Sequence, residues 1–391
     1  MAFDFIRDDL AQRRDNQLLR QRFALPQGHG RMLSFDGKQY LNFSGNDYLG
    51  MASHPQVIQS AHQALDQYGA GSGGSALVTG FGKAQSALEE YLCDWLGVQR
   101  CLLFNAGFAA NSGVIQTLMT HADDTVIQDK LNHASLVDAG LNCAAKLVRY
   151  RHNDLRHLQQ KLALTNPAKG NHLVVTEGVF SMDGDSAPLA QIQIMARASD
   201  SWLMVDDAHG FGVLGDEGKG TANAQGLKAG SVDITMATFG KAVGTMGAFV
   251  AASADTIEYL VQFCRHYIYS TAMPAYMAAA THTSLLCLAK EQWRRDKLTH
   301  LIGYFKTKMV ALGLADNHSD TAIQPLIIGC AGKTLQISQA LKDQGIWLTA
   351  IRPPTVAANT ARLRVTLHCL HHEADIDHLF NALEQAIDAT N

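Results

Sequence analysis

The sequence predicts an α/β protein with a mostly parallel sheet of seven strands and a smaller α+β domain at its C-terminal end. From about residue 100 onward, short apolar runs alternate with helical segments. This alternation is typical of a parallel sheet that is covered by helices on both faces. Apolar residues make up 47% of the 391 residues and charged residues only 17%, which is enough apolar material for a large core.

Residues 1–49 are predicted to form an N-terminal arm. Three leucines lie among arginines in residues 10–23, which predicts a surface helix that leads into an extended segment at 39–50. The large domain is expected to follow at residues 50–288, with amphipathic helices at 57–68 and 87–97. Seven apolar runs mark the strands of its sheet, at 100–104, 125–129, 146–150, 172–180, 202–207, 233–239 and 246–252.

The small domain is expected at residues 289–391, because the pattern there changes to longer helices and fewer strands. Helical spacing covers 297–312 and 337–345, and strands are expected at 324–329 and 361–367. A chain of this length fits two domains, since single cores stop growing at roughly 250–300 residues.

Charge and cysteine content exclude several functional classes. The 32 Lys and Arg against 36 Asp and Glu give a formal charge of −4, which excludes a protein that binds nucleic acid through bulk positive charge. The seven cysteines are scattered without a CxxC pair, so neither a disulfide framework nor a zinc site is indicated. No signal peptide and no apolar run of membrane-spanning length is present. We expect a cytoplasmic protein without a metal.

The segment VDDAHG places Asp206 and His209 at the carboxyl end of a very apolar strand. A carboxylate in such a place is costly unless a cation lies near it. The cation could be a metal ion or a protonated ring nitrogen, and the lack of further clustered ligands disfavours the metal. The alternative is a capping Asp with a satisfied His.

Lys241 ends a later apolar run and lies between Gly240 and Ala242, which leave its amine approachable. A desolvated lysine loses its proton readily and can form a Schiff base with a carbonyl group. It follows Asp206 by 35 residues, one strand–connection–strand interval, so both could meet at one sheet edge. Most lysines, however, are surface charges.

Two further segments allow a functional or an ordinary interpretation. Residues 105–111 lie between a strand and a helix, so the N–H groups of Gly107 and Phe108 could bind an anion; an ordinary turn is the alternative. Alternation places Arg362 and Arg364 on the same strand face, where a guanidinium could bind a carboxylate, although an exposed face is favoured for either one alone. We interpret the cluster of histidines and a cysteine at 368–372 as solvated surface.

Nine segments in order along the chain closely resemble the α-oxoamine synthases, pyridoxal-phosphate enzymes with the aspartate-aminotransferase fold (fold type I). These segments are NFSGNDYLG, GSGGSALVTG, GFAAN, HASLVDA, TEGVFSMDGD, VDDAHGFGVLG, TFGKA, YSTAMP and RPPT, and they extend over nearly the whole chain. The resemblance implies a homodimeric acyltransferase. The branch that it favours joins L-alanine to a pimeloyl thioester, on CoA or on a carrier protein, in biotin synthesis.

The resemblance also implies roles for single residues. Lys241 would hold the cofactor as an imine, Asp206 would pair with the pyridine nitrogen, His209 would hydrogen-bond the ring phenolate oxygen, and His133 would stack on the ring. Further cofactor contacts, largely around the phosphate, are implied for Gly107, Phe108, Ser181 and Thr238, with Ser270 and Thr271 reaching the phosphate of the partner subunit.

For the substrates, Arg364 would bind the alanine carboxylate with Asn46 beside it, and His133 would help to orient the Cα bond that breaks. Arg20 and Thr355 match acyl-substrate positions. Phe211, Ala76 and Val243 depart from the usual family residues, which affects the expected pocket shape. The rival interpretations are glycine C-acetyltransferase, serine palmitoyltransferase or another α-oxoamine synthase, an aminotransferase, and a catalytically silent subunit.

Overall fold

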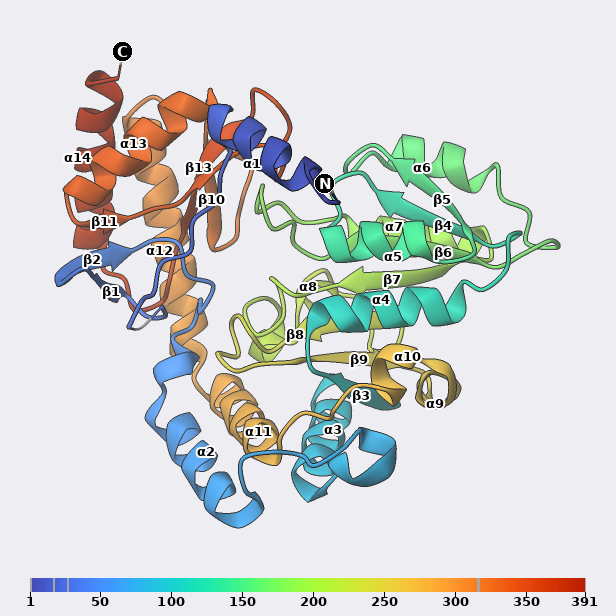
Figure 1. Cartoon of the computed structure of the whole chain (residues 1–391). Coiled ribbons are helices and arrows are strands. Elements are labelled where there is room, and N and C mark those ends of the chain that lie inside the picture. The colour runs from blue at the N-terminus through green and yellow to red at the C-terminus, as the bar shows by residue number, and fades with distance from the viewer. Residues whose placement is uncertain (1, 17, 27, 315–316, 391) are drawn as a thin grey trace. The chain divides into compact units, whose positions relative to one another are not determined.

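The computed structural model describes residues 2–16, 18–26, 28–314 and 317–390 of the chain (Figure 1). The chain divides into two compact units. Unit 1 comprises Met1–Tyr48, Met182–Gly184 and Asp296–Asn391, and unit 2 comprises Leu49–Ser181 and Asp185–Arg295. The domain boundaries expected from the sequence stay predictions.

A seven-stranded sheet forms the centre of unit 2, as the sequence predicts. The strand order is β3-β9-β8-β7-β6-β4-β5, and β9 runs antiparallel to both of its neighbours whereas the other pairs are parallel. The strands are β3 (Arg100–Phe104), β4 (Thr125–Asp129), β5 (Lys146–Tyr150), β6 (His172–Glu177), β7 (Trp202–Asp206), β8 (Ile234–Thr238) and β9 (Ala248–Ala252).

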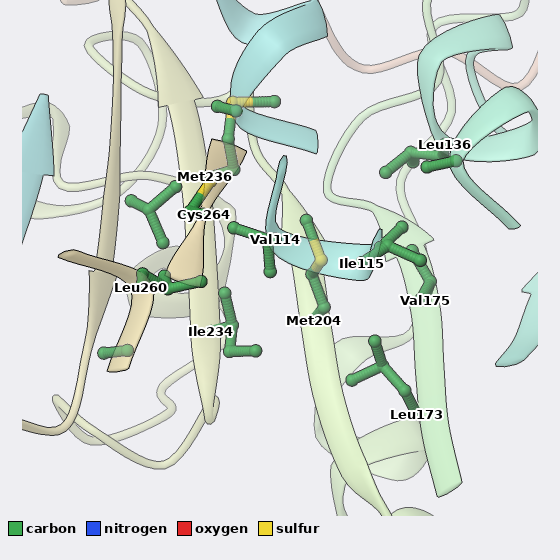
Figure 2. Packing of buried hydrophobic residues seen from close by; sticks show 14 of the residues in the cluster. Val114, Ile115, Leu136, Leu173, Val175, Met204, Ile234, Met236, Leu260 and Cys264 are labelled. Atoms are coloured by element: carbon green, nitrogen blue, oxygen red, sulfur yellow. The ribbon is translucent and has the colours of Figure 1, made fainter. Parts of the chain in front are cut away.

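Helices cover this sheet on both faces (Figure 1). One apolar core packs α4 (Gly107–Leu118), α5 (Ala134–Asn142) and α9 (Ala254–Phe263) against alternate strand residues, among them Val175 and Met204 (Figure 2). The residues between these, such as Val174 and Val205, point to the other face and pack against α6 (Leu155–Leu162) and α7 (Leu189–Ala198). Because both faces are buried, the central strands β6, β7 and β8 are mostly apolar on both faces, whereas the edge strand β5 carries the exposed Lys146 and Arg149.

The remaining helices of unit 2 are α2 (Pro55–Tyr68), α3 (Lys83–Leu96), α8 (Thr221–Ala224), α10 (Arg265–Ile268) and α11 (Ala275–Lys290), with short turns of other helix types at Met51–Ser53, Ala76–Gly80 and Asp216–Gly218. Of these helices, α10 packs against the first core through Tyr267 and α8 packs against the second through Ala222. The helix α12 (Gln292–Ala311) begins in unit 2 and continues into unit 1.

Unit 1 contains two small sheets of three strands each. The first has the order β1-β2-β11, from β1 (Met32–Phe35), β2 (Lys38–Asn42) and β11 (Ile346–Trp347); the second has the order β10-β13-β12, from β10 (Ile323–Gly329), β12 (Ala350–Ile351) and β13 (Ala361–Thr366). The helices of this unit are α1 (Phe5–Asp15), α13 (Ala331–Asp343) and α14 (Glu373–Asp388).

The N-terminal helix differs from the one predicted over 10–23. It spans Phe5–Asp15, and the chain beyond Leu18 is not helical; Gln17, inside the predicted helix, lies outside the described residues. The reason is a tertiary contact, since the Phe23 ring packs edge-on against Phe35 and Trp347 at centroid distances of 5.3 and 5.5 Å. Packing of this aromatic cluster outweighs the helical propensity of the leucines and arginines.

Two surface predictions for the C-terminal residues are wrong. Arg362 and Arg364 are only 5% and 8% exposed, because every residue of β13 is buried. His368, Cys369 and His371 are buried as well, and only His372 is exposed. The partners come from distant parts of the chain: the His371 ring hydrogen-bonds the Asn42 carbonyl at 3.0 Å.

No helix among the described residues is both long enough and apolar enough to cross a membrane. All seven cysteines are free thiols.

Candidate active site

Lys241 and His209 meet beside the carboxyl ends of β7 and β8. Both residues lie in turns that follow these neighbouring strands, and Nζ of Lys241 is 2.8 Å from Nε2 of His209. An ammonium group at this distance donates to a neutral imidazole that carries its proton on Nδ1. His209 is only 8% exposed, whereas Lys241 is partly exposed.

Asp206 is the last residue of β7 and belongs to a buried polar network. Its carboxylate accepts a hydrogen bond from Nδ2 of Asn111 at 2.7 Å and another from the Ala208 N–H at 3.0 Å. The same Asn111 amide donates to Oγ of Ser135 at 2.9 Å, which ties α4 to α5. Both donors to Asp206 are neutral, so this network of described residues leaves the carboxylate able to pair with a cationic ligand group.

His133 lies at the start of α5, where its side chain caps the helix. Nδ1 accepts from the Ser135 N–H at 3.3 Å and lies 2.8 Å from the Ser135 hydroxyl, so the ring proton resides on Nε2. Burial lowers the pKa of His133; Asp206 opposes this effect and Lys241 adds to it. The ring is therefore neutral at neutral pH, as suits an aromatic stacking surface.

Glu177 is a residue that the sequence reasoning missed, although it lies in the quoted segment TEGVFSMDGD. It ends β6 directly beside Asp206 in the strand register and is 2% exposed. Burial and then the Asp206 charge raise the pKa of Glu177 well above its usual range. The signal that singled out Asp206, an acid at the end of an apolar strand, applied equally to Glu177.

The residues expected at a phosphate gather around the N-terminus of α4. This helix begins at Gly107, and Ala106 before it supplies no side-chain cap, so the first N–H groups can donate to an anion. A Cβ atom on Gly107 would lie 3.9 Å from Cβ of Thr238, which places β8 against the same helix end. Thr238 donates through its hydroxyl to the Gly247 carbonyl at 2.8 Å.

Ser270 and Thr271 lie near the same helix end within the chain. The Asn105 amide donates to the Thr271 carbonyl, and both residues line a small cavity with Asn105. Their reach to the phosphate of a partner subunit stays a prediction. Ser181 follows β6 in a turn and is partly buried.

In unit 1, Arg364 and Asn46 are brought together. Both terminal nitrogens of the Arg364 guanidinium lie near Oδ1 of Asn46, at 3.3 and 3.4 Å, and one of them donates to the Thr366 hydroxyl at 3.1 Å. Tyr48 donates to the same Asn46 oxygen at 3.3 Å. The guanidinium is thus oriented by neutral oxygens, which suits a group that binds a carboxylate.

Arg20 and Thr355 form a second pair in unit 1. Arg20 donates to the Thr355 hydroxyl at 3.1 Å, and both residues line a cavity of about 780 Å³. The charged side chains among its described lining residues are cationic, namely Arg20, Lys342 and Arg352. Burial and then the nearby Arg20 charge lower the pKa of Arg352.

Two of the three residues that depart from the family pattern are packed into cores. Phe211 is 2% exposed, with its ring against Phe249 and Trp95 at centroid distances of 5.0 and 5.7 Å. Val243 is completely buried, and Ala76 is partly exposed.

Comparison with known proteins places this geometry in a family. The family model described as aminotransferase class I and II matches residues 38–383. The chain belongs to this family. Its curated relatives include 8-amino-7-oxononanoate synthases from Salmonella typhi and Salmonella typhimurium, each 48% identical over 381 residues, which cover 97% of this chain and 97% of the relative. The resemblance to α-oxoamine synthases is confirmed.

Solved structures of the same family confirm the fold type I architecture. A serine palmitoyltransferase from S. paucimobilis with bound PLP and myriocin has a TM-score of 0.92 at 30% identity, covering 99% of this chain and 98% of that one. An 8-amino-7-oxononanoate synthase from Francisella tularensis has a TM-score of 0.77 at 28% identity, covering 90% and 98%. A further serine palmitoyltransferase structure also contains PLP, so pyridoxal 5′-phosphate is a cofactor of this family.

Proposed function

We propose that the protein condenses L-alanine with a pimeloyl thioester to give 8-amino-7-oxononanoate, CO2 and the free thiol of the acyl carrier, as a step of biotin synthesis. The observation that carries this proposal is the 48% identity, over nearly the full length, to relatives named for that product. Lys241, His209 and Asp206, at the carboxyl ends of β7 and β8, are an amine, an imidazole and a carboxylate that suit this reaction.

The residues present fit pyridoxal 5′-phosphate. Asp206 is a buried carboxylate whose donors are neutral, which suits a protonated ring nitrogen. Lys241 is the amine for the aldehyde, and His209 beside it is the donor for the ring oxygen. The uncapped start of α4 at Gly107 suits the phosphate. When bound, the cofactor supplies a ring that takes up the electron pair of a carbanion next to the substrate nitrogen.

Lys241 acts first as the anchor and then as the base. As the base, its Nζ would remove the Cα proton of alanine and would later return a proton to the product carbon. His209, 2.8 Å away, accepts a hydrogen bond from the protonated amine and so stabilises that state. Asp206 would hold the ring nitrogen of the bound cofactor, because a carboxylate favours the protonated form of a nitrogen near it.

Orientation of the substrate decides which bond at Cα is weakened. We assign the alanine carboxylate to Arg364, which Asn46 and Thr366 hold in place. His133 provides a neutral ring for stacking, since its Nδ1 is engaged by Ser135. A carboxylate that is held by a guanidinium leaves the substrate few orientations, which is how Arg364 would select the bond that breaks.

The acyl donor is assigned to the cavity of about 780 Å³ that Arg20 and Thr355 line. Its cationic side chains suit an acyl chain that ends in a carboxylate or a carrier that contains phosphate. Both pimeloyl-CoA and a pimeloyl carrier protein meet this description. A homodimer and a cytoplasmic location complete the proposal; the scattered cysteines of the sequence favour the latter.

A second candidate reaction of the same class is the condensation of L-serine with palmitoyl-CoA. One observation favours it, the TM-score of 0.92 between this chain and a serine palmitoyltransferase. The test is a comparison of initial rates for three substrate pairs: L-alanine with pimeloyl-CoA, L-serine with palmitoyl-CoA, and glycine with acetyl-CoA. We expect the first pair to be fastest and to release CO2 and thiol in equal amounts. Faster turnover of another pair would reject the substrate assignment, and absence of turnover with all of them would support a silent subunit.

A further inference from the structure

Glu177 and Asp206 are two carboxyl groups on neighbouring parallel strands at the same height. The register of β6 and β7 pairs the two residues, so their side chains lie on the same face of the sheet at adjacent positions. Glu177 is 2% and Asp206 is 4% exposed. Two carboxylates so close together in a buried place cannot both be ionised without a large cost.

The hydrogen bonds of the two groups differ. Asp206 accepts two bonds from N–H groups, at 2.7 and 3.0 Å, which stabilise its ionised form. The carboxyl of Glu177 receives a hydrogen bond from the backbone of His133, but its Oε1 has no hydrogen-bond partner among the described residues. A proton shared between the two groups therefore belongs on Glu177.

We propose that Glu177 is a neutral carboxylic acid in the resting protein, which leaves the negative charge on Asp206 and presents a hydrogen-bond donor to the site. The role of that donor rests on the proposed function. Glu177 is in this sense a positioning residue: it holds the backbone of His133 and keeps the charge on the carboxylate that serves the cofactor ring.

The surrounding charges agree with this assignment. Burial is the largest cause that raises the pKa of Glu177, followed by Asp206, and Asp129 at the end of β4 acts in the same direction. Lys241 and the backbone of His133 lower the pKa, but to a smaller extent than burial and Asp206 raise it. Together these effects raise the pKa of Glu177 well above its ordinary value of 4.5.

The pH dependence of stability tests the protonation state without any cofactor. In the unfolded chain Glu177 ionises above about pH 4.5, whereas the folded protein keeps the proton. Unfolding then releases a proton, and the unfolding constant of the wild type rises about tenfold per pH unit from this group alone. Glu177→Gln removes this linkage, and all other groups cancel in the comparison.

We therefore expect the ratio of the unfolding constants, wild type over Glu177→Gln, to rise about tenfold per pH unit above about pH 5. The measurement is urea denaturation of the cofactor-free protein at several pH values. Glu384→Gln, at an exposed position of α14, is the matched control and should give a ratio that does not vary in this way. A ratio for Glu177→Gln that stays constant from pH 5 to pH 8 would overturn the proposal.

Glu177→Met separates the charge from the hydrogen-bond donor. It should reproduce the pH trend of Glu177→Gln, and it replaces that variant if the latter does not fold. The Gln amide can donate a hydrogen bond but the Met thioether cannot, so we expect cofactor affinity to fall more than tenfold further in Glu177→Met than in Glu177→Gln. Equal affinities would contradict the donor role. The stability measurement decides the protonation state even if the proposed reaction is not observed.

Discussion

Nζ of Lys241 lies 2.8 Å from Nε2 of His209, and each residue follows one of two adjacent parallel strands. This contact places a hydrogen-bonding imidazole beside the amine. Only a neutral amine attacks an aldehyde, and only a neutral amine removes a proton from substrate carbon. The imidazole can accept a hydrogen bond from the ammonium form and can also donate to the cofactor oxygen once the amine is engaged. We therefore expect Lys241 and His209 to function together in the reaction.

Lys241→Ala is expected to abolish covalent attachment of the cofactor. The shift in visible absorbance that follows addition of pyridoxal phosphate to the wild type should be lost, and alanine-dependent CO2 release should fall by more than about 10³-fold, since anchor and base are both removed. Lys146→Ala, at an exposed position of β5, should match the wild type in both measurements. Wild-type spectra for Lys241→Ala would rule out its role as the anchor.

Asp206→Asn preserves the shape of the side chain but removes its charge. The cofactor should still attach to Lys241, because that bond does not involve position 206. Loss of the carboxylate leaves the ring nitrogen without its anion, so exchange of the alanine Cα proton should slow by roughly 10²-fold or more. Exchange is measured by NMR in D2O, with the exposed turn variant Asp200→Asn as control. Undiminished exchange would refute the assigned role.

The sequence predicts well what depends on local pattern. Short apolar runs mark the strands of the large sheet, and the 35-residue interval from Asp206 to Lys241 spans two neighbouring strands, since Asp206 ends β7, Lys241 follows β8, and β7 pairs with β8. An apolar run reveals that a strand is buried on both faces without any knowledge of its partners.

What the sequence did not reveal depends on contacts between distant residues. Arg362 is buried because it forms an ion pair with Asp183, which lies 179 positions earlier in the chain. His371 is buried because its partner is the carbonyl of Asn42, 329 positions away. Nothing in the local pattern of ARLRVTL or of the histidine cluster indicates these partners, so both segments resemble exposed surface.

Arg364→Lys is expected to weaken alanine binding more than cofactor binding. A lysine ammonium lacks the planar fork that binds a carboxylate through two nitrogens, so the KM for L-alanine should rise by about tenfold or more. The affinity for pyridoxal phosphate should remain within about twofold of the wild type. Steady-state kinetics and cofactor titration provide the two measurements, with exposed Arg13→Lys as control. A change confined to cofactor affinity would remove Arg364 from the alanine site.

His152 gives a prediction for pH-dependent stability. Its two ring nitrogens lie 3.0 Å from Asp129 and 2.8 Å from Asp185, so both must carry protons. Burial alone would lower the pKa of His152, but the two carboxylates outweigh it and raise the pKa to about 10. Asp129 also accepts from the Leu131 N–H at 2.8 Å, so the charged ring supports the loop that leads to the start of α5.

Because the folded pKa of His152 is raised, its contribution to stability is complete below the ordinary value of 6.5 and is lost as the pH rises toward about 10. The contribution is at most a few kcal/mol, since the side chain is partly exposed. His152→Gln should therefore be less stable than the wild type near pH 6, and the two should converge near pH 10 in urea denaturation of the cofactor-free protein. Exposed His62→Gln should show no such convergence. A stability difference for His152→Gln that is the same at both pH values would mean that the ring is not charged in the folded protein, and that the loop to α5 is held by the other hydrogen bonds of Asp129.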